Sequence, residues 1–257
     1  MPDLKIESTQ RFSSRVENYL KYRPGYPAAL VDFLSRACGL TVAHTVADIG
    51  SGTGLLTELF LEHGNPVIGV EPNREMRVAG ERCLRNYPRF QSIAAAAEAT
   101  TLADASVDLI TAGQAFHWFK RAETRREFVR ILKPGGWVAL VWNDRNISAN
   151  PFSKAYEDLL VKFGTDYEAV GHKHVDAAGM GAFFAPNAFK IASFPNRQVF
   201  DAEGLLGRLL SSSYVPEAGD PKYAPMLAAL ADLFAEHQSG GTVSFEYDTT
   251  VYYGSLT

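Results

Sequence analysis

The chain has 257 residues, of which 46% are hydrophobic and 21% charged, so it has a globular composition and the length for one large α/β domain. Its formal net charge of -4 gives no general attraction for nucleic acid, and no apolar run reaches the roughly 18 residues that span a bilayer. Its two cysteines supply neither a disulfide framework nor a metal-binding set. We therefore expect a soluble cytoplasmic protein, monomeric or homodimeric, with no nucleic-acid or membrane partner and no metal.

An aromatic and basic segment near the N-terminus ends in Tyr22-Arg23-Pro24-Gly25-Tyr26-Pro27. Pro24 and Pro27 exclude a helix through this stretch, and the apolar residues from Leu30 to Leu34 predict a helix after it. Two interpretations stay open. The tyrosines pack against the core, or the segment forms a lid over a bound ligand.

The stretch that organises the chain runs from residue 46 to residue 60. Val46–Ile49 predicts a buried parallel strand, Gly50-Ser51-Gly52-Thr53-Gly54 follows, and apolar residues then recur at helical spacing. A strand, a glycine turn and a helix in this order form a nucleotide-binding elbow, because glycine lets a ligand approach the backbone and the helix start offers free N–H groups. The dinucleotide fingerprint would have its third glycine where Leu55 stands, which disfavours NAD. A glycine turn in an unrelated α/β protein is the alternative.

The next predicted strand, residues 66–71, ends in an acid. Glu71 follows Gly54 at close to the roughly 20 residues expected for a ribose-binding acid, and a carboxylate can accept from both ribose hydroxyls. The alternative is a solvated acid beside the helix that begins near Asn73. In that helix, Met76 either touches an adenine or fills the core.

Two further strands are predicted at residues 90–96 and 106–112, and the second leads into Gln114-Ala115-Phe116-His117-Trp118. Ligands of an open α/β sheet bind beyond the carboxyl ends of its strands, so this polar and aromatic cluster lies where a site is expected. His117 has the pKa range of a general base for a hydroxyl or a carbon acid. The alternative is a structural histidine that holds the loop.

The regular alternation of strand and helix ends after the predicted fifth strand, residues 137–142. Residues 164–186, rich in Gly and Ala, predict a loop, in which His172 and His174 have no further ligands at metal spacing. Residues 243–248 alternate apolar and polar side chains, as an edge strand with one wet face does. The other periodic segments are a helix at 152–163, strands at 189–194 and 198–200, and helices at 205–210 and 223–234.

Three motifs carry a resemblance to a known family. Asp48-Ile49-Gly50-Ser51-Gly52-Thr53-Gly54 resembles motif I of the class I S-adenosylmethionine (SAM) methyltransferases. Residues 22–27 and 114–118 are similar to its type 11 small-molecule subgroup, which includes trans-aconitate methyltransferases. The resemblance implies a Rossmann-like, doubly wound, seven-stranded sheet that is mostly parallel with an antiparallel last strand.

We expect one domain over residues 1–257. Its core covers about 40–145 together with the C-terminal strands. A helical cap from about 1–40, 150–187 and 203–240 closes the acceptor pocket.

The resemblance also implies how SAM is held. Motif I wraps its methionine end, Arg23 is a candidate partner for its carboxylate, and Gln114 one for its methionine portion. Ala97 and Glu98 resemble the family's A-E-x-L-P loop beside the adenine, although the proline is missing here and Glu98 has a surface-acid alternative. The predicted cofactor-binding residues are Arg23, Asp48, Gly50, Ser51, Gly52, Glu71, Met76, Ala97, Glu98 and Gln114.

The acceptor pocket is expected among aromatic residues, because aromatic faces also attract a sulfonium. Core packing is the alternative for each of them. Arg145 and Arg197 are further candidates, with a solvated or packing role as the alternative, and His117 is the candidate catalytic residue. The predicted pocket residues are Tyr22, Phe116, Trp118 and Tyr214.

Together these motifs predict transfer of a methyl group from SAM to a small molecule by in-line displacement, with S-adenosylhomocysteine (SAH) as the product. A carboxylate or hydroxyl oxygen is favoured as the acceptor atom, and carbon is possible. An NAD-dependent oxidoreductase and a non-catalytic SAM-binding regulatory protein stay open as alternatives. A macromolecular substrate is disfavoured by the acidic pI of about 5.9 and by the absence of Asn/Asp-Pro-Pro-Tyr after the fourth strand.

Overall fold

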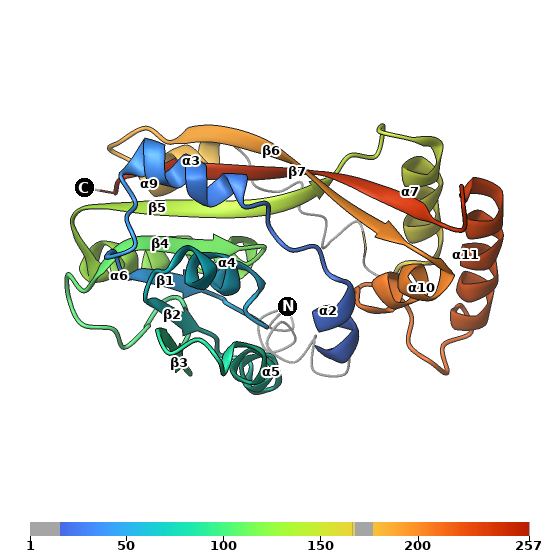
Figure 1. The fold of residues 1–257 in the computed structure, drawn as a ribbon, viewed down its shortest axis with the longest axis horizontal. Coiled ribbons are helices and arrows are strands. Elements are labelled where there is room, and N and C mark those ends of the chain that lie inside the picture. The colour runs from blue at the N-terminus through green and yellow to red at the C-terminus, as the bar shows by residue number, and fades with distance from the viewer. Residues whose placement is uncertain (1–15, 166, 168–176, 257) are drawn as a thin grey trace.

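The computed structural model describes residues 16–165, 167 and 177–256, so His172 and His174 lie outside the described residues. One sheet holds the strands in the order β3-β2-β1-β4-β5-β7-β6. β1 to β5 run parallel, and β7 is antiparallel to both of its neighbours (Figure 1). The predicted fold class is therefore confirmed. The strands are β1 (Val46–Ile49), β2 (Val67–Val70), β3 (Phe90–Ile93), β4 (Val107–Gly113), β5 (Leu132–Arg145), β6 (Lys190–Phe200) and β7 (Val243–Gly254).

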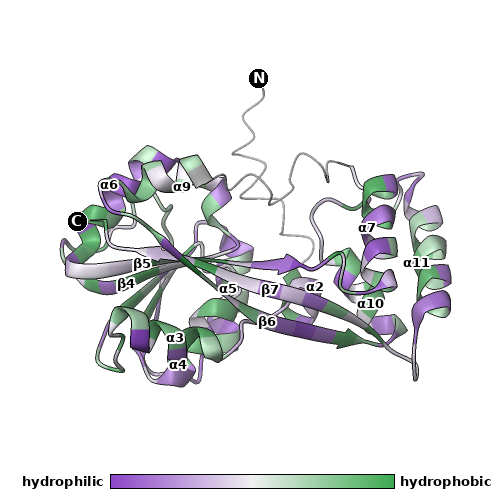
Figure 2. Ribbon diagram, turned by 90° about the horizontal axis from the view of Figure 1, so that it is seen from above, coloured by the Kyte–Doolittle hydropathy of each residue, from purple (hydrophilic) through white to green (hydrophobic). Residues whose placement is uncertain are grey.

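Helices cover both faces of this sheet, with α6 and α9 on one side and α3 and α4 on the other (Figure 2). This arrangement explains why β1 is buried along its whole length and reads as a short apolar run. The helices are α2 (Val16–Tyr22), α3 (Ala29–Cys38), α4 (Leu55–His63), α5 (Arg74–Leu84), α6 (Arg121–Ile131), α7 (Pro151–Phe163), α9 (Ala177–Phe184), α10 (Ala202–Leu210) and α11 (Tyr223–His237).

A cap of α2, α7, α10 and α11 lies beyond one end of the sheet core (Figures 1 and 2). Its own apolar cluster joins these helices to the far halves of β6 and β7 through side chains such as Tyr156, Leu209 and Phe245. β7 has 12 residues where β1 has four, which at roughly 3.3 Å per residue makes β7 about 40 Å long. The long C-terminal strands therefore carry the cap.

Part of the segment that the sequence assigns to a loop at residues 164–186 is helical. Ala177–Phe184 forms α9, whose Phe183 and Phe184 are buried in the sheet core. The two glycines of α9 lower its helix propensity, and burial of its aromatic residues overrides that preference. α3 likewise packs on the sheet through Leu30 and Leu34.

The last strand is not at an edge. β7 pairs with β5 on one side and with β6 on the other, so the expectation of an edge strand is wrong. An alternating pattern reports how many faces of a strand are covered, not how many neighbours it has. The edge strand beside β7 is β6, which is continuous through Pro195. An edge strand tolerates proline, which has no N–H to donate.

Candidate active site

The glycine turn after β1 fits closely against the loop that follows β4. Gly50, Gly52 and Gly54 have φ values of 71°, 57° and 91°, a region that favours glycine. A Cβ added to Gly50 would also lie 2.6 Å from the Cβ of Ala115. The turn therefore needs glycine for its conformation and for this contact between the two loops.

Asp48 stabilises the start of the turn through two hydrogen bonds of its buried carboxylate. Its carboxylate accepts from the hydroxyl of Thr57 at 2.6 Å and from that of Thr111 at 3.2 Å, and only 1% of the residue is exposed. Burial raises the pKa of Asp48 to about 6, against the opposing effect of the two threonine hydrogen bonds. The structure thus places this predicted cofactor residue where it joins β1, α4 and β4.

Glu71, which follows β2, binds the glycine turn through its carboxylate. Its Oε2 accepts from the backbone N–H of Gly52 at 2.9 Å, and its Oε1 accepts from that of Asn73 at 2.8 Å. Burial raises the pKa of Glu71, and the two backbone hydrogen bonds lower it in part. Each oxygen keeps a further lone pair, so the same carboxylate can also accept from ribose hydroxyls. Met76 is buried and lies beside Gly52.

The loop after β3 meets the loop after β4 through Glu98. The carboxylate of this half-buried residue accepts from the backbone N–H of Lys120 at 2.8 Å, beside the buried Ala97. This hydrogen bond fixes the loop without the proline that the family motif has. The structure therefore brings four strand-end loops to the same side of the sheet.

Gln114 has the most unusual conformation of the site. Its φ of 54° is rare for a residue other than glycine, and its side-chain Nε2 donates to the backbone oxygen of Asn143 at 3.1 Å. Its Oε1 is buried without a hydrogen-bond partner among the described residues. Backbone strain of this kind costs roughly 1–3 kcal/mol and is concentrated at functional sites.

Phe116 does not line an open pocket. It has no exposed surface and packs edge-on against Phe183 at 4.6 Å and against Trp142 at 6.3 Å. The core-packing alternative therefore describes Phe116, which holds the loop on the sheet. Trp118 is partly exposed and lies beside His117, with their ring centroids 4.7 Å apart.

His117 is a poor general base in this environment. Burial lowers its pKa to about 4, so the ring is neutral near pH 7, whereas proton transfer is most efficient when the pKa is close to the working pH. Between pH 6.5 and about 4 the unfolded chain binds a proton that the native ring does not. The native state consequently loses stability as the pH falls through this range.

We predict that His117→Asn reduces this loss. In urea unfolding, the wild type should lose about 2 kcal/mol more than the variant between pH 7.5 and pH 5, from about 1.4 kcal/mol per pKa unit. Equal losses in the two proteins would show that burial does not keep His117 neutral.

The N-terminal segment crosses from the cap to the strand ends. Tyr22 is buried in the cap cluster, and the Nη2 of Arg23 donates to the backbone oxygen of Ser211 at 3.0 Å. Two residues later, the backbone oxygen of Gly25 accepts from Asn143 at 3.1 Å, and the Tyr26 ring lies against Gly113. Arg23 therefore lies between the cap and the candidate site.

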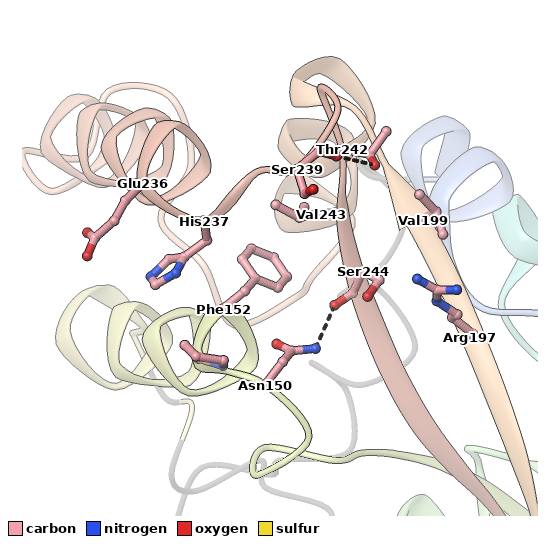
Figure 3. A pocket seen from close by; sticks show the side chains of 11 residues that line it. Asn150, Phe152, Arg197, Val199, Glu236, His237, Ser239, Thr242, Val243 and Ser244 are labelled. Carbon is pink, nitrogen blue, oxygen red and sulfur yellow. Dashed lines mark hydrogen bonds between the residues drawn. The ribbon is translucent and has the colours of Figure 1, made fainter.

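Tyr214 and Arg197 lie in different parts of the cap. Tyr214 is 7% exposed in the cap cluster. Arg197 lies on the outer edge strand, where it pairs with Glu246 at 3.0 Å and lines an outer pocket of ≈ 500 Å³ (Figure 3). The other residues around this pocket come from α7, α11 and the β6–β7 end, and none comes from the four strand-end loops. We therefore do not assign the candidate active site to the outer pocket.

Sequence reasoning missed Asn143, which links three parts of the site. It is 6% exposed, its amide donates to the Gly25 oxygen, and its backbone oxygen holds Gln114. The rule that places ligands beyond the carboxyl ends of strands would have indicated it, because it follows the apolar part of β5. Within the described ranges, no three His, Cys, Asp or Glu side chains form a group that could hold a metal ion, and no helix there is long and apolar enough to cross a bilayer.

Comparison with known proteins identifies the core. Residues 47–140 match the family model described as a methyltransferase domain. Residues 47–140, from β1 into β5, are therefore a methyltransferase domain. An uncharacterized methyltransferase of Mycobacterium tuberculosis is 38% identical over 135 residues, which are 52% of this chain and 53% of that protein. The match therefore spans about half the length of this curated relative.

Solved structures show the same methyltransferase fold. A protein from Anaeromyxobacter dehalogenans, described as a type II methyltransferase, is 21% identical with a TM-score of 0.69, over 91% of this chain and 98% of the other. Phosphoethanolamine N-methyltransferase 2 of Haemonchus contortus, which is 13% identical with a TM-score of 0.58, was solved with SAH. That match covers 98% of this chain and 60% of the other.

Proposed function

We propose that this protein transfers the methyl group of SAM to a small-molecule acceptor. One observation supports this proposal above all. The glycine turn, Glu71 and Gln114 lie at the carboxyl ends of the neighbouring strands β1, β2 and β4. The strand order reverses between β1 and β4, and open α/β sheets bind ligands at such a switch point.

The residues present fit this cofactor. The turn from Gly50 to Gly52 would offer backbone to the methionine end, and Glu71 would accept from the ribose hydroxyls. The buried Oε1 of Gln114 would accept from the ammonium group. Met76 and the loop of Ala97 and Glu98 would hold the adenine. Bound SAM supplies an electrophilic methyl group, whose bond to sulfur breaks as the acceptor atom forms a bond to it, leaving SAH.

A carboxylate or hydroxyl oxygen is our favoured acceptor, and carbon is possible. A carboxylate reacts without losing a proton, which suits a site whose histidine has a pKa of about 4. Alignment of acceptor, methyl carbon and sulfur can contribute roughly 7–11 kcal/mol in well-oriented reactions. Positioning, more than proton transfer, then carries the catalysis.

The first test is calorimetric titration with SAH and, on the same preparation, with NADH. We expect micromolar binding of SAH and none of NADH. A screen with SAM carrying a labelled methyl group, over small carboxylic acids and phenols, then separates an enzyme from a regulatory SAM-binding protein. Binding of NADH without SAH would contradict the proposal.

A further inference from the structure

We propose that the cap contains a binding site for the acidic group of the methyl acceptor, formed by Arg23, Arg145 and Arg208 around Tyr214. Its ligand is a small organic molecule with two negative charges, carried by two carboxylates or one phosphate monoester. This inference rests on the proposed function, because it names the class of acceptor for the same site.

Three arginines from distant parts of the sequence converge in the cap. Arg23 follows α2, Arg145 ends β5 and Arg208 lies in α10, where only 4% of it is exposed. Burial would raise the pKa of Tyr214, but the positive charges of the three arginines lower it below 10.0. Burial and the charge of Arg208 together lower the pKa of Arg23. Direct contacts also join the three arginines. Arg145 lies 5.1 Å from the centroid of the Tyr156 ring and Arg208 lies 6.0 Å from that of Phe245, and these two rings are 4.7 Å apart. Arg23 donates to the backbone oxygen of Ser211, whose hydroxyl donates to the backbone oxygen of Arg208.

These arginines have donors left over. The Nε atoms of Arg23 and Arg208, and the Nη1 of Arg145, are buried without a hydrogen-bond partner in the part of the chain that the structure describes. The hydroxyl of the fully buried Tyr156, over whose ring Arg145 lies at 5.1 Å, is in the same state. Buried polar groups are nearly always paired, so donors from several elements without partners indicate a ligand.

The charges are also unbalanced. Among the described residues, the one acid paired with these arginines is Glu157, which accepts from the Nη2 of Arg145 at 2.7 Å. Three guanidinium groups and one carboxylate leave a formal excess of two positive charges. Uncompensated buried charge is costly, and a guanidinium binds carboxylates and phosphates through paired hydrogen bonds. A dianion satisfies both the charge and the donors.

Other arginines show that this state is not general in the chain. Arg130 pairs with Asp104 at 2.6 Å and with Glu127 at 2.7 Å, and Arg125 donates to three backbone oxygens, two of them in Phe183 and Leu256. Arg130 and Arg125 therefore use their donors within the protein, whereas each of the cap arginines keeps a buried donor that a ligand can use.

The position of the cluster suits an acceptor. Arg145 lies two residues after Asn143, whose backbone oxygen holds Gln114, and Arg23 lies two residues before Gly25, which Asn143 also binds. An acid held by the arginines is therefore next to the loop that we assign to the methionine end of the cofactor.

The test measures anion binding by the full chain in the presence of saturating SAH. Succinate and inorganic phosphate are titrated by calorimetry at constant ionic strength into the wild type, Arg208→Met and Arg197→Met. Arg197→Met removes the same charge from the exposed outer strand and is the matched control.

We expect the wild type to bind at least one of these anions, and Arg208→Met to bind it at least about tenfold more weakly. Arg197→Met should bind it like the wild type. Without anion, Arg208→Met should unfold at no lower temperature than the wild type, because it removes an uncompensated buried charge. A merely structural arginine would instead lower the unfolding temperature. Preference for succinate identifies a dicarboxylate, and preference for phosphate a phosphate monoester.

The inference is overturned if the wild type binds SAH but neither anion, or if Arg208→Met keeps full anion affinity. Should Arg208→Met not fold, Arg208→Lys keeps the charge but loses the planar fork, and it should still weaken binding severalfold. Failure of the proposed function gives a different result, namely no SAH binding by the wild type in the same titrations.

Discussion

Replacing Gly207 with alanine destabilises the protein by forcing α2 and α10 of the cap apart. A Cβ on Gly207 would lie 1.9 Å from the Cε2 and 2.3 Å from the Cδ2 of Tyr22. The tyrosine ring is enclosed by the cap cluster, with Phe200 edge-on at 6.4 Å, so α10 and α2 must move apart. Overpacking costs roughly 1–3 kcal/mol or more, which exceeds the gain of about 1 kcal/mol for alanine over glycine in a helix. Urea unfolding measures the difference.

Gly181→Ala is the matched control for this substitution. Gly181 also lies within a helix, α9, but a Cβ there meets nothing within 4 Å. We expect this variant to be as stable as the wild type or up to about 1 kcal/mol more stable. If Gly207→Ala behaves in the same way, the close packing of α2 on α10 is not present in solution.

Local sequence signals predicted the part of the fold that holds the cofactor loops. The strand at Val46–Ile49, the glycine turn and the helix from Leu55 are encoded by adjacent residues, and the structure confirms all three. The acid at Glu71 follows from spacing along the chain, and the structure brings its carboxylate to the Gly52 N–H. These features succeed because each depends on residues close in sequence.

Features that depend on distant residues were harder to predict. Phe116 and Trp118 are aromatic residues of the same motif. Phe116 is buried against Phe183, whereas Trp118 is partly exposed. α9 is a helix because its aromatic residues fill the space beside α6, which its own composition does not indicate. The place of β7 between β5 and β6 is likewise a property of the whole sheet.

The sequence contains one signal of the arginine cluster, at Arg208. It interrupts the leucine-rich stretch of α10, and a charged residue in an apolar helix is informative when it is buried. Its significance appears only when Arg23 and Arg145 are seen beside it, because pairing between segments cannot be derived from periodicity.

Glu71→Ala should weaken SAH binding by about 10- to 100-fold. A hydrogen bond to a charged group contributes roughly 1.5–3 kcal/mol, and the substitution removes the carboxylate that we assign to the ribose hydroxyls. It also leaves the backbone N–H groups of Gly52 and Asn73 without their acceptor, so the glycine turn loses the hydrogen bond that ties it to the end of β2. Calorimetric titration with SAH measures the affinity, and urea unfolding reports how much of the loss comes from a loosened turn.

Glu58→Ala separates these effects from a simple loss of one negative charge. Glu58 lies in the first turn of α4, and its carboxylate accepts at 3.3 Å from the hydroxyl of Tyr87, which precedes β3. This variant should bind SAH within about twofold of the wild type, since the hydrogen bond that it removes is made to Tyr87 and not to the glycine turn. Equal affinity for SAH in Glu71→Ala and Glu58→Ala would mean that the cofactor does not bind at the end of β2. The chemistry assigned to the glycine turn would then have to be placed elsewhere, because Glu71 and Gly52 are held together by one hydrogen bond.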